Sequence, residues 1–288
     1  MVRLFLEVKI MGKRFSASNV PLLAGVVKER TPKDALEKIR YFEEKGATAI
    51  DLHLSCLDDE YKTVDAIKQI ADGTSLPTLA LNYSRRYDWT EIVESEEDRA
   101  ELLIKGLEAG LDAVDLLGYS FDLESRGKFK GDDIYSFTKN NPLEIVTDKK
   151  VIEKQKEFIN RVHGMGKEVL LSTHPDIPMN GDQIINLVTF LAERNPDIIK
   201  IVTRCNTEDE LVEAYDTMRR LKKLNLRQKI SFHCCGEMGR TTRLINPVLG
   251  SYMCFCTKAD DGNRIKEQLD IVTAVNFFKQ FGWIDSES

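Results

Sequence analysis

Eight short aliphatic or β-branched runs, each followed by a longer amphipathic stretch, constrain the fold more than any other feature of this sequence. The runs cover residues 21–27, 47–54, 77–83, 112–117, 168–174, 198–203, 229–234 and 251–256. Strands that alternate with helices in this way build βαβ units around a parallel sheet. The alternation therefore predicts an α/β protein with its strands buried on both faces.

Helix boundary signals between the runs support this interpretation. Thr31 precedes Pro32 at the start of one amphipathic stretch, which is typical of an N-cap followed by the first helical residue. Thr207 precedes Glu210 by three residues, the spacing of a capping box. Eight strand and helix pairs predict a (β/α)8 TIM barrel. A doubly wound open sheet is the alternative, but no glycine-rich phosphate fingerprint follows the first run.

Two segments fall outside the alternation. Residues 2–15 alternate with a period of two around Met11, Gly12 and Lys13, which predicts a β-hairpin that closes the bottom of the barrel. Residues 118–148 are polar, studded with aromatic side chains and longer than an ordinary βα loop. Because they follow a strand at the catalytic end of a barrel, we expect a lid-like insertion. Residues 1–288 are thus predicted to form one barrel domain.

The bulk composition excludes several classes of protein. A net charge of −6 gives no basic footprint for nucleic acid, so anionic small molecules would need local cations. No run approaches about 18 apolar residues, and the N-terminus lacks a signal-peptide pattern, so we expect no membrane span. The six cysteines show neither disulfide-framework nor metal-knuckle spacing, which favours reduced thiols and a cytoplasmic location. The sequence is compatible with a homodimer.

Lys200 is the residue that fits its surroundings least. It lies in DIIKIVTR, a run that otherwise predicts a buried strand. Burial disfavours the charged form of an amine, so this side chain is expected to be nucleophilic and suited to a Schiff base with a ketone. The alternative is a lysine that extends its head group to solvent. His174 ends the preceding strand and would supply general acid and base catalysis, unless it is a hydrogen-bonded loop histidine.

The segment CCGEMGRTTRL at 234–244 has the features of an anion site. Its glycines allow backbone amides to approach a ligand, and Arg240 and Arg243 follow at the start of the next helix. An arginine fork bonds both oxygens of a carboxylate. We expect Arg243 to do so and Arg240 to lie on the helix surface.

A metal site is a further alternative. Asp51 and His53 share a face of the second strand, and His174 and His233 end two other strands. Such a set around a barrel mouth could bind zinc or manganese. The ligands have no tight local spacing, so we expect no metal and no organic cofactor.

With these residues in place, the chain resembles the type I 3-dehydroquinate dehydratases, the Schiff-base-forming barrels of the shikimate pathway. LLSTHPD is similar to the catalytic-histidine segment of that family, DIIKIVTRCNT to its lysine strand, and CCGEMGRTTRLINPVLGSYMCF to its glycine and arginine segment. The resemblance implies that Lys200 forms the imine, that His174 is the general acid and base, and that Arg243 binds the substrate carboxylate.

Several positions depart from the family pattern. Asp51 and His53 stand where the family has a glutamate and an arginine, and Asn82 stands where it has a substrate-binding arginine. Arg264, or Asn263 beside it, lies near the place of the family's glutamine. We expect Asp51, His53, Asn82, Arg264 and Arg243 to bind the substrate, in a pocket that favours a ketone related to 3-dehydroquinate.

The sequence therefore favours a lyase that eliminates water from an anionic cyclic β-hydroxy ketone through a lysine Schiff base. Three alternatives remain at this point. They are a diverged Schiff-base lyase or class I aldolase that acts on another keto acid, a metal-dependent barrel lyase or isomerase, and a binding barrel without catalysis.

Overall fold

The structure is a computed structural model that describes residues 14–83, 95–122, 144–175, 177–262 and 267–283. The strands are β1 (Leu22–Val27), β2 (Ala49–His53), β3 (Thr78–Leu81), β4 (Ala113–Leu117), β5 (Glu168–Thr173), β6 (Ile198–Arg204), β7 (Lys229–Cys235), β8 (Met253–Thr257) and β9 (Leu269–Asp270). The α-helices are α2 (Pro32–Glu44), α3 (Val64–Asp72), α4 (Glu96–Glu108), α6 (Lys149–Gly164), α7 (Gly181–Ala192), α8 (Glu208–Leu221), α9 (Gly239–Leu249) and α10 (Ile271–Lys279). Short 3-10 turns are η1 (Phe15–Ala17), η2 (Leu54–Cys56) and η3 (Asp59–Tyr61).

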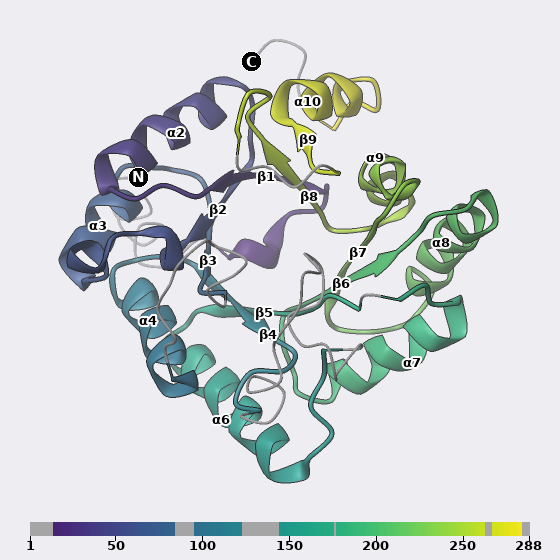
Figure 1. Ribbon diagram of the computed structural model, residues 1–288, viewed down its shortest axis with the longest axis horizontal. Helices are drawn as coiled ribbons and strands as arrows, with labels where there is room; N and C mark the ends of the chain where they lie inside the picture. Colours follow the sequence, from purple (N-terminus) through teal and green to yellow (C-terminus); the bar gives the residue numbers. More distant parts are fainter. Residues whose placement is uncertain (1–13, 84–94, 123–143, 176, 263–266, 284–288) are drawn as a thin grey trace, which may run out of the picture.

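All the strands pair in parallel in one curled sheet with the order β7-β6-β5-β4-β3-β2-β1-β8-β9. Figure 1 looks down the centre of this sheet and shows the helices as an outer ring. The amide of Tyr252 donates to the carbonyl of Ile230 at 2.8 Å, so the chain entering β8 lies beside the start of β7. The eight predicted strands are confirmed, and the fold is TIM-barrel-like; the short β9 was not predicted.

Two apolar clusters explain why these runs form strands. Side chains that alternate along each strand point either into the barrel or out toward the helices. The inner cluster includes Ala24, Leu79 and Ile198, while the outer cluster includes Ile199 and packs against the helices. Both faces are therefore buried, which is why the strands appear in the sequence as continuous aliphatic runs.

The predicted helix caps are present. The Thr31 side chain accepts from the amide of Asp34, with Pro32 at the first helical position of α2. Thr207 and Glu210 form a reciprocal capping box at the start of α8. These local signals determine where both helices begin.

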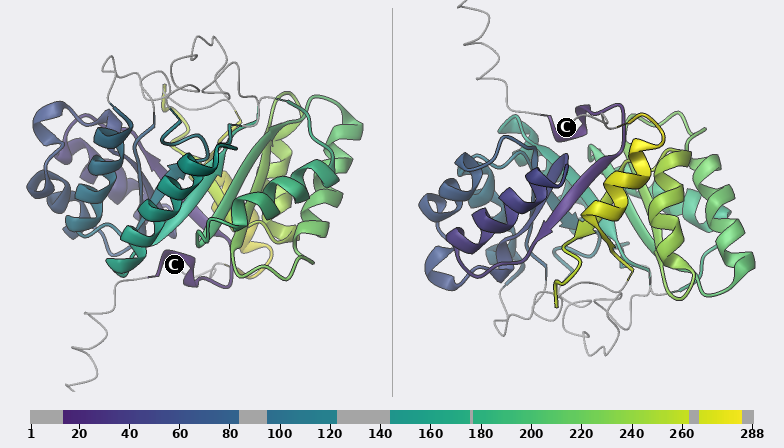
Figure 2. Two further views of the ribbon diagram at one scale, coloured as in Figure 1. Left: turned by 90° about the horizontal axis from the view of Figure 1, so that it is seen from below. Right: turned by 90° about the horizontal axis from the view of Figure 1, so that it is seen from above.

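The barrel is closed at the end opposite the carboxyl ends of the strands by η1, which Figure 2 shows at one end of the molecule. Phe15 belongs to the inner apolar cluster and is 1% exposed. The Tyr252 hydroxyl donates to the Phe15 carbonyl at 2.8 Å, and the amide of Ser16 donates to Glu168 at 2.9 Å. The predicted hairpin is wrong at its last residue, Phe15, because that residue packs as a 3-10 plug; residues 2–13 lie outside the described part of the chain.

The insertion predicted at 118–148 is described at its two stems, and residues 123–143 lie outside the described part of the chain. At the first stem, the amide of Gly118 donates to the Ser172 carbonyl at 2.6 Å. Glycine is needed there because an added Cβ would meet the Glu144 carbonyl oxygen at 2.5 Å. The Gln155 side chain donates to the Gly118 carbonyl at 3.0 Å, and the Arg194 guanidinium donates to the Val146 carbonyl at 2.8 Å. Both stems are thus anchored against β5, α6 and the turn that follows α7. The lid itself stays a prediction.

Candidate active site

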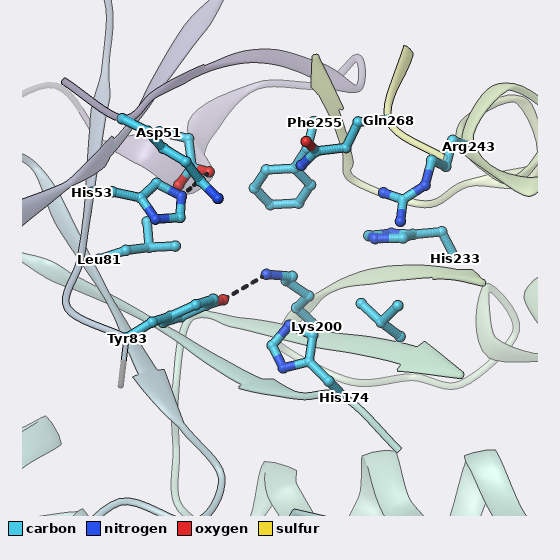
Figure 3. A pocket seen from close by; sticks show the side chains of 12 residues that line it. Asp51, His53, Leu81, Tyr83, His174, Lys200, His233, Arg243, Phe255 and Gln268 are labelled. Atoms are coloured by element: carbon cyan, nitrogen blue, oxygen red, sulfur yellow. Dashed lines mark hydrogen bonds and ion pairs between the residues drawn. The ribbon is translucent and has the colours of Figure 1, made fainter. Parts of the chain in front are cut away.

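A pocket opens at the carboxyl ends of the strands. Figure 3 shows side chains from several strands and from α9 that converge on it. Its lining consists of Lys28, Asp51, His53, Leu81, Tyr83, His174, Lys200, Val202, His233, Arg243, Phe255 and Gln268. Five of the candidate residues from the sequence are thereby brought together: Lys200, His174, Arg243, Asp51 and His53.

Lys200 lies in the middle of β6 and is 5% exposed, so its head group is largely shielded from solvent. Its Nζ donates to the Tyr83 hydroxyl at 3.0 Å, lies 3.5 Å from the Asp115 carboxylate, and sits 4.6 Å from the centre of the Phe255 ring. Burial raises the pKa of Asp115 above its ordinary value, against the opposing effects of the Lys200 charge and of hydrogen bonds from Ser172 and Tyr83. The amine is therefore held by the Tyr83 hydroxyl and by a carboxylate that burial makes harder to ionise.

His174 follows β5 directly and is buried beside the pocket. Its ring meets the Tyr83 ring edge-on, with 5.7 Å between centres. The Glu144 carboxylate accepts a hydrogen bond from the His174 amide at 3.1 Å and lies 3.4 Å from Nδ1. Burial, and then the charges of Lys200 and Arg243, hold the pKa of His174 well below its ordinary value. The ring is therefore neutral at pH 7, the form that can accept a proton.

Arg243 lies in the first turns of α9 and is buried, whereas Arg240 is exposed, as the sequence predicts. Figure 3 shows the Arg243 guanidinium and the His233 ring directed toward the same space as Lys200. Within the described residues, Nε of Arg243 has no hydrogen-bond partner. A buried donor without a partner is costly, so this group is poised for a ligand oxygen. Burial, then the charges of Arg243 and Lys200, lower the pKa of His233 well below its ordinary value.

The opposite wall of the pocket comes from β2 and the end of β3. The side chains of Asp51 and His53 share one face of β2, with 3.5 Å between Oδ2 and Nε2 (Figure 3). Oδ1 of Asp51 is buried and has no hydrogen-bond partner in the part of the chain that the structure describes. The His53 ring packs edge-on against Tyr83 at 5.7 Å. The described residues of this wall therefore present hydrogen-bonding groups and no arginine.

One predicted substrate-binding residue, Asn82, does not line the pocket. The Asn82 side chain points away from it and donates to the Arg99 carbonyl on α4 at 3.1 Å. Tyr83 faces inward instead, since the inward positions continue from Leu79 and Leu81 in steps of two. The prediction for Asn82 was wrong by one residue, which is enough to change the face. Arg264 lies outside the described residues, and Gln268, just before β9, lines the pocket.

Sequence reasoning also missed residues that complete the site. Asp115 interrupts the apolar run DAVDLL as Lys200 interrupts its own run, so the same signal was available. Strict alternation along β3 places Tyr83 on the same face as Leu79 and Leu81, but it does not tell which face points inward. Glu144 and Gln268 belong to irregular segments, where no period indicates which side chains turn inward.

The metal alternative finds no support in the geometry. Among the described residues, no three histidine, cysteine, aspartate or glutamate side chains are grouped so that they could hold a metal ion. The rings of His53 and His174 each pack edge-on against Tyr83, with 5.7 Å between ring centres. In the same described part of the chain, no helix has the length and apolar character required to cross a membrane.

A family model described as type I 3-dehydroquinase matches residues 24–282. The chain belongs to this family. Among curated proteins, it is 28% identical over 116 residues to the 3-dehydroquinate dehydratase of Alkaliphilus oremlandii and 28% identical over 117 residues to that of Streptococcus suis. Each match covers 40% of this chain, and the two matches span 44% and 47% of those relatives, less than half of their length.

Solved structures show the same fold over most of the chain. The 3-dehydroquinate dehydratase of Geobacillus kaustophilus superposes with a TM-score of 0.70 at 11% identity and covers 92% of both chains. The type I enzyme of Clostridium difficile, solved with covalently modified comenic acid, also has a TM-score of 0.70, at 14% identity over 92% of this chain and 93% of that one. At such identities the likeness concerns the fold, and the roles of side chains must be argued from the pocket itself.

Proposed function

We propose that this protein is a hydro-lyase of the type I 3-dehydroquinate dehydratase kind. The observation that carries the proposal is a lysine amine buried at the centre of a pocket, near a neutral histidine and a buried arginine with an open donor. The family to which the chain belongs supports the same chemistry. These side chains suffice for the reaction without a metal or organic cofactor.

Each group has a step that suits its environment. Lys200 attacks the substrate ketone, and loss of water gives an iminium ion that withdraws electrons from the neighbouring carbon. His174 takes a proton from that carbon, and the resulting enamine expels the β-hydroxyl group, which leaves as water after receiving a proton from His174. Hydrolysis of the product iminium frees Lys200. Arg243 holds the substrate carboxylate, which keeps the ring oriented throughout.

The substrate proposed is an anionic cyclic β-hydroxy ketone with its carboxylate at Arg243. The facing wall offers Asp51, His53 and Tyr83, which suit hydroxyl groups, and the open Oδ1 of Asp51 is an acceptor for one of them. Among the described residues, this wall has no arginine where the family resemblance predicts one. We therefore expect 3-dehydroquinate to be turned over poorly and a related ketone to be preferred. Uncompensated loss of such contacts costs on the order of 2 to 5 kcal/mol each.

The proposal is tested by borohydride reduction of the protein with 3-dehydroquinate and with related cyclic keto acids, followed by peptide mass spectrometry. We expect the ligand mass on Lys200 and none in Lys200→Met. Lys229→Met is the matched control, since that lysine starts the next strand, at the other end of the barrel. Labelling that persists in Lys200→Met would refute the Schiff-base assignment.

A steady-state assay decides the substrate. A kcat/KM for 3-dehydroquinate of about 10⁴ M⁻¹s⁻¹ or more lies in the normal enzyme range and would contradict the altered pocket. Products of carbon–carbon cleavage would instead identify a class I aldolase. Absence of trapping with every ketone would favour a binding barrel, and activity restored by zinc or manganese after chelation would favour the metal-dependent alternative.

A further inference from the structure

A chain of hydrogen bonds crosses four neighbouring strands beneath the pocket. Nζ of Lys200 on β6 donates to the hydroxyl of Tyr83, just beyond β3, at 3.0 Å. That hydroxyl donates to Oδ2 of Asp115 on β4 at 2.9 Å, and Ser172 on β5 donates to Oδ1 of the same carboxylate at 2.5 Å. The tyrosine oxygen thus contacts both the amine and the carboxylate at distances that allow proton transfer, and each contact is shorter than the direct 3.5 Å between Nζ and Oδ2.

The chain is shielded from bulk water. Lys200, Tyr83, Asp115 and Ser172 are all at most 5% exposed. The rings of His53 and His174 pack edge-on against either side of Tyr83, so its hydroxyl is held in one place. A proton that leaves Lys200 in this setting needs a nearby acceptor, because solvent does not reach the amine freely.

The groups along the chain have the chemistry for this task. A tyrosine hydroxyl can accept one proton while it donates another, whereas an arginine can only donate. Burial raises the pKa of Asp115, so its protonated form is accessible at a pH where an exposed aspartate would stay ionised. Ser172 stabilises the ionised form by its hydrogen bond, so neither state of the carboxyl group is excluded.

We propose that Tyr83 relays protons between Lys200 and Asp115 during imine formation, so that this tyrosine acts on the reacting amine and Asp115 acts through it. The inference rests on the proposed function of Lys200. The ammonium of Lys200 passes a proton to Tyr83 as Tyr83 passes its own to Asp115, which leaves a neutral amine. The amine attacks the ketone carbon, and one of its remaining protons moves to the carbonyl oxygen to give the carbinolamine.

The stored proton completes the step. The carbon–oxygen bond of the carbinolamine breaks as the proton returns from Asp115 through Tyr83 to the departing hydroxyl, which leaves as water. The nitrogen lone pair forms the carbon–nitrogen double bond of the iminium ion. The net change is ketone plus ammonium to iminium plus water, so Tyr83 and Asp115 end in their starting states.

The test measures imine formation in Tyr83→Phe, which removes only the hydroxyl. The probes are 4-oxocyclohexane-1-carboxylate, a cyclic keto acid without a leaving group, and formaldehyde, which forms an imine with any neutral amine. Borohydride or cyanoborohydride traps each imine, and mass spectrometry follows Lys200 from pH 6 to 10, with Lys229 as the internal reference. Tyr252→Phe is the matched control, because it removes a buried tyrosine hydroxyl at the other end of the barrel.

We expect trapping at Lys200 to slow about 10²-fold at pH 7 in Tyr83→Phe, the scale of a lost proton-transfer group. The deficit should shrink as pH rises, because hydroxide then takes the ammonium proton, while Tyr252→Phe keeps the wild-type rate. Asp115→Asn keeps an acceptor for Tyr83 but cannot store a proton, so it should show the same profile, and it carries the test if Tyr83→Phe does not fold.

Wild-type rates in both variants, or a uniform loss without a change in pH profile, would overturn the relay. The outcome is separable from failure of the proposed function. If the wild-type protein traps formaldehyde but no keto acid at Lys200, the proposed function is wrong, and the formaldehyde rates still decide whether Tyr83 relays protons.

Discussion

Two buried histidines should make the stability of this protein depend on pH. Burial and the nearby cations hold the folded-state pKa values of His174 and His233 well below 6.5, near which they titrate in the unfolded chain. Below pH 6.5 these histidines therefore bind protons in the unfolded chain but not in the folded chain. The contribution of the two histidines to stability is complete above pH 6.5 and is lost as pH falls toward the folded pKa values.

The size of the effect follows from linkage. Between pH 6.5 and 5.5, one such histidine lowers the free energy of unfolding by about 1 kcal/mol, so the pair lowers it by about 2 kcal/mol. Asp115 acts in the opposite direction, because its raised folded pKa gives stability that is present below 3.8 and is lost as pH rises through the folded value. The opposing change that Asp115 makes to the free energy of unfolding is at most about 1.4 kcal/mol per pH unit.

Urea unfolding at pH 8.5, 7.5, 6.5 and 5.5 measures these contributions. The free energy of unfolding should fall by about 1 kcal/mol less between pH 6.5 and 5.5 in His233→Leu than in the wild type. In Asp115→Asn it should fall by more than in the wild type. Between pH 8.5 and 7.5 the histidine contributions should be flat, which serves as an internal control. An unchanged difference between pH 6.5 and 5.5 in His233→Leu would show that this histidine is not held neutral by burial, and the electrostatic reasoning for the pocket would fail with it.

Three further predictions concern the site and its support. His174→Ala should lower turnover by about 10²-fold or more while borohydride trapping of the imine continues, as measured by steady-state kinetics and mass spectrometry. Arg243→Ala should weaken binding of an acidic substrate by on the order of 2 to 5 kcal/mol in calorimetry, with little effect from the exposed Arg240→Ala. Gly118→Ala should lower the free energy of unfolding by about 1 to 3 kcal/mol, because its Cβ would meet a backbone oxygen at 2.5 Å. Gly164→Ala, with no atom within 4 Å, is the control and should not destabilise.

The strands could be predicted from the sequence because burial on both faces demands long aliphatic runs. Five of the eight predicted runs contain the whole observed strand, and the other three miss one residue at its C-terminal end. Lys200 stood out for the same reason, since a charge inside such a run contradicts its surroundings. Asp115 is also a charged residue inside an aliphatic run, but it was not predicted as a site residue. In the structure the two side chains lie 3.5 Å apart.

The walls of the pocket were harder to predict because they depend on which face a side chain takes. In a strand buried on both sides, hydrophobicity does not reveal whether the odd-numbered or the even-numbered residues point inward. Asn82 and Tyr83 are adjacent, yet one hydrogen-bonds to α4 and the other to the lysine. Glu144 reaches His174 from an irregular segment 30 residues away in the chain, and no local pattern indicates that contact.

Substrate binding should also change the histidine that does the chemistry. The charge of Arg243 is one cause of the lowered pKa of His174, after burial and Lys200. A substrate carboxylate on Arg243 cancels much of that charge, so the pKa of His174 should rise when the substrate binds. The ring would then hold the abstracted proton more readily and could pass it to the leaving hydroxyl. Because kcat reports the bound enzyme and kcat/KM the free enzyme, the acidic limb of the kcat profile should lie at higher pH than that of kcat/KM. Coincident limbs would mean that Arg243 anchors the substrate without tuning His174.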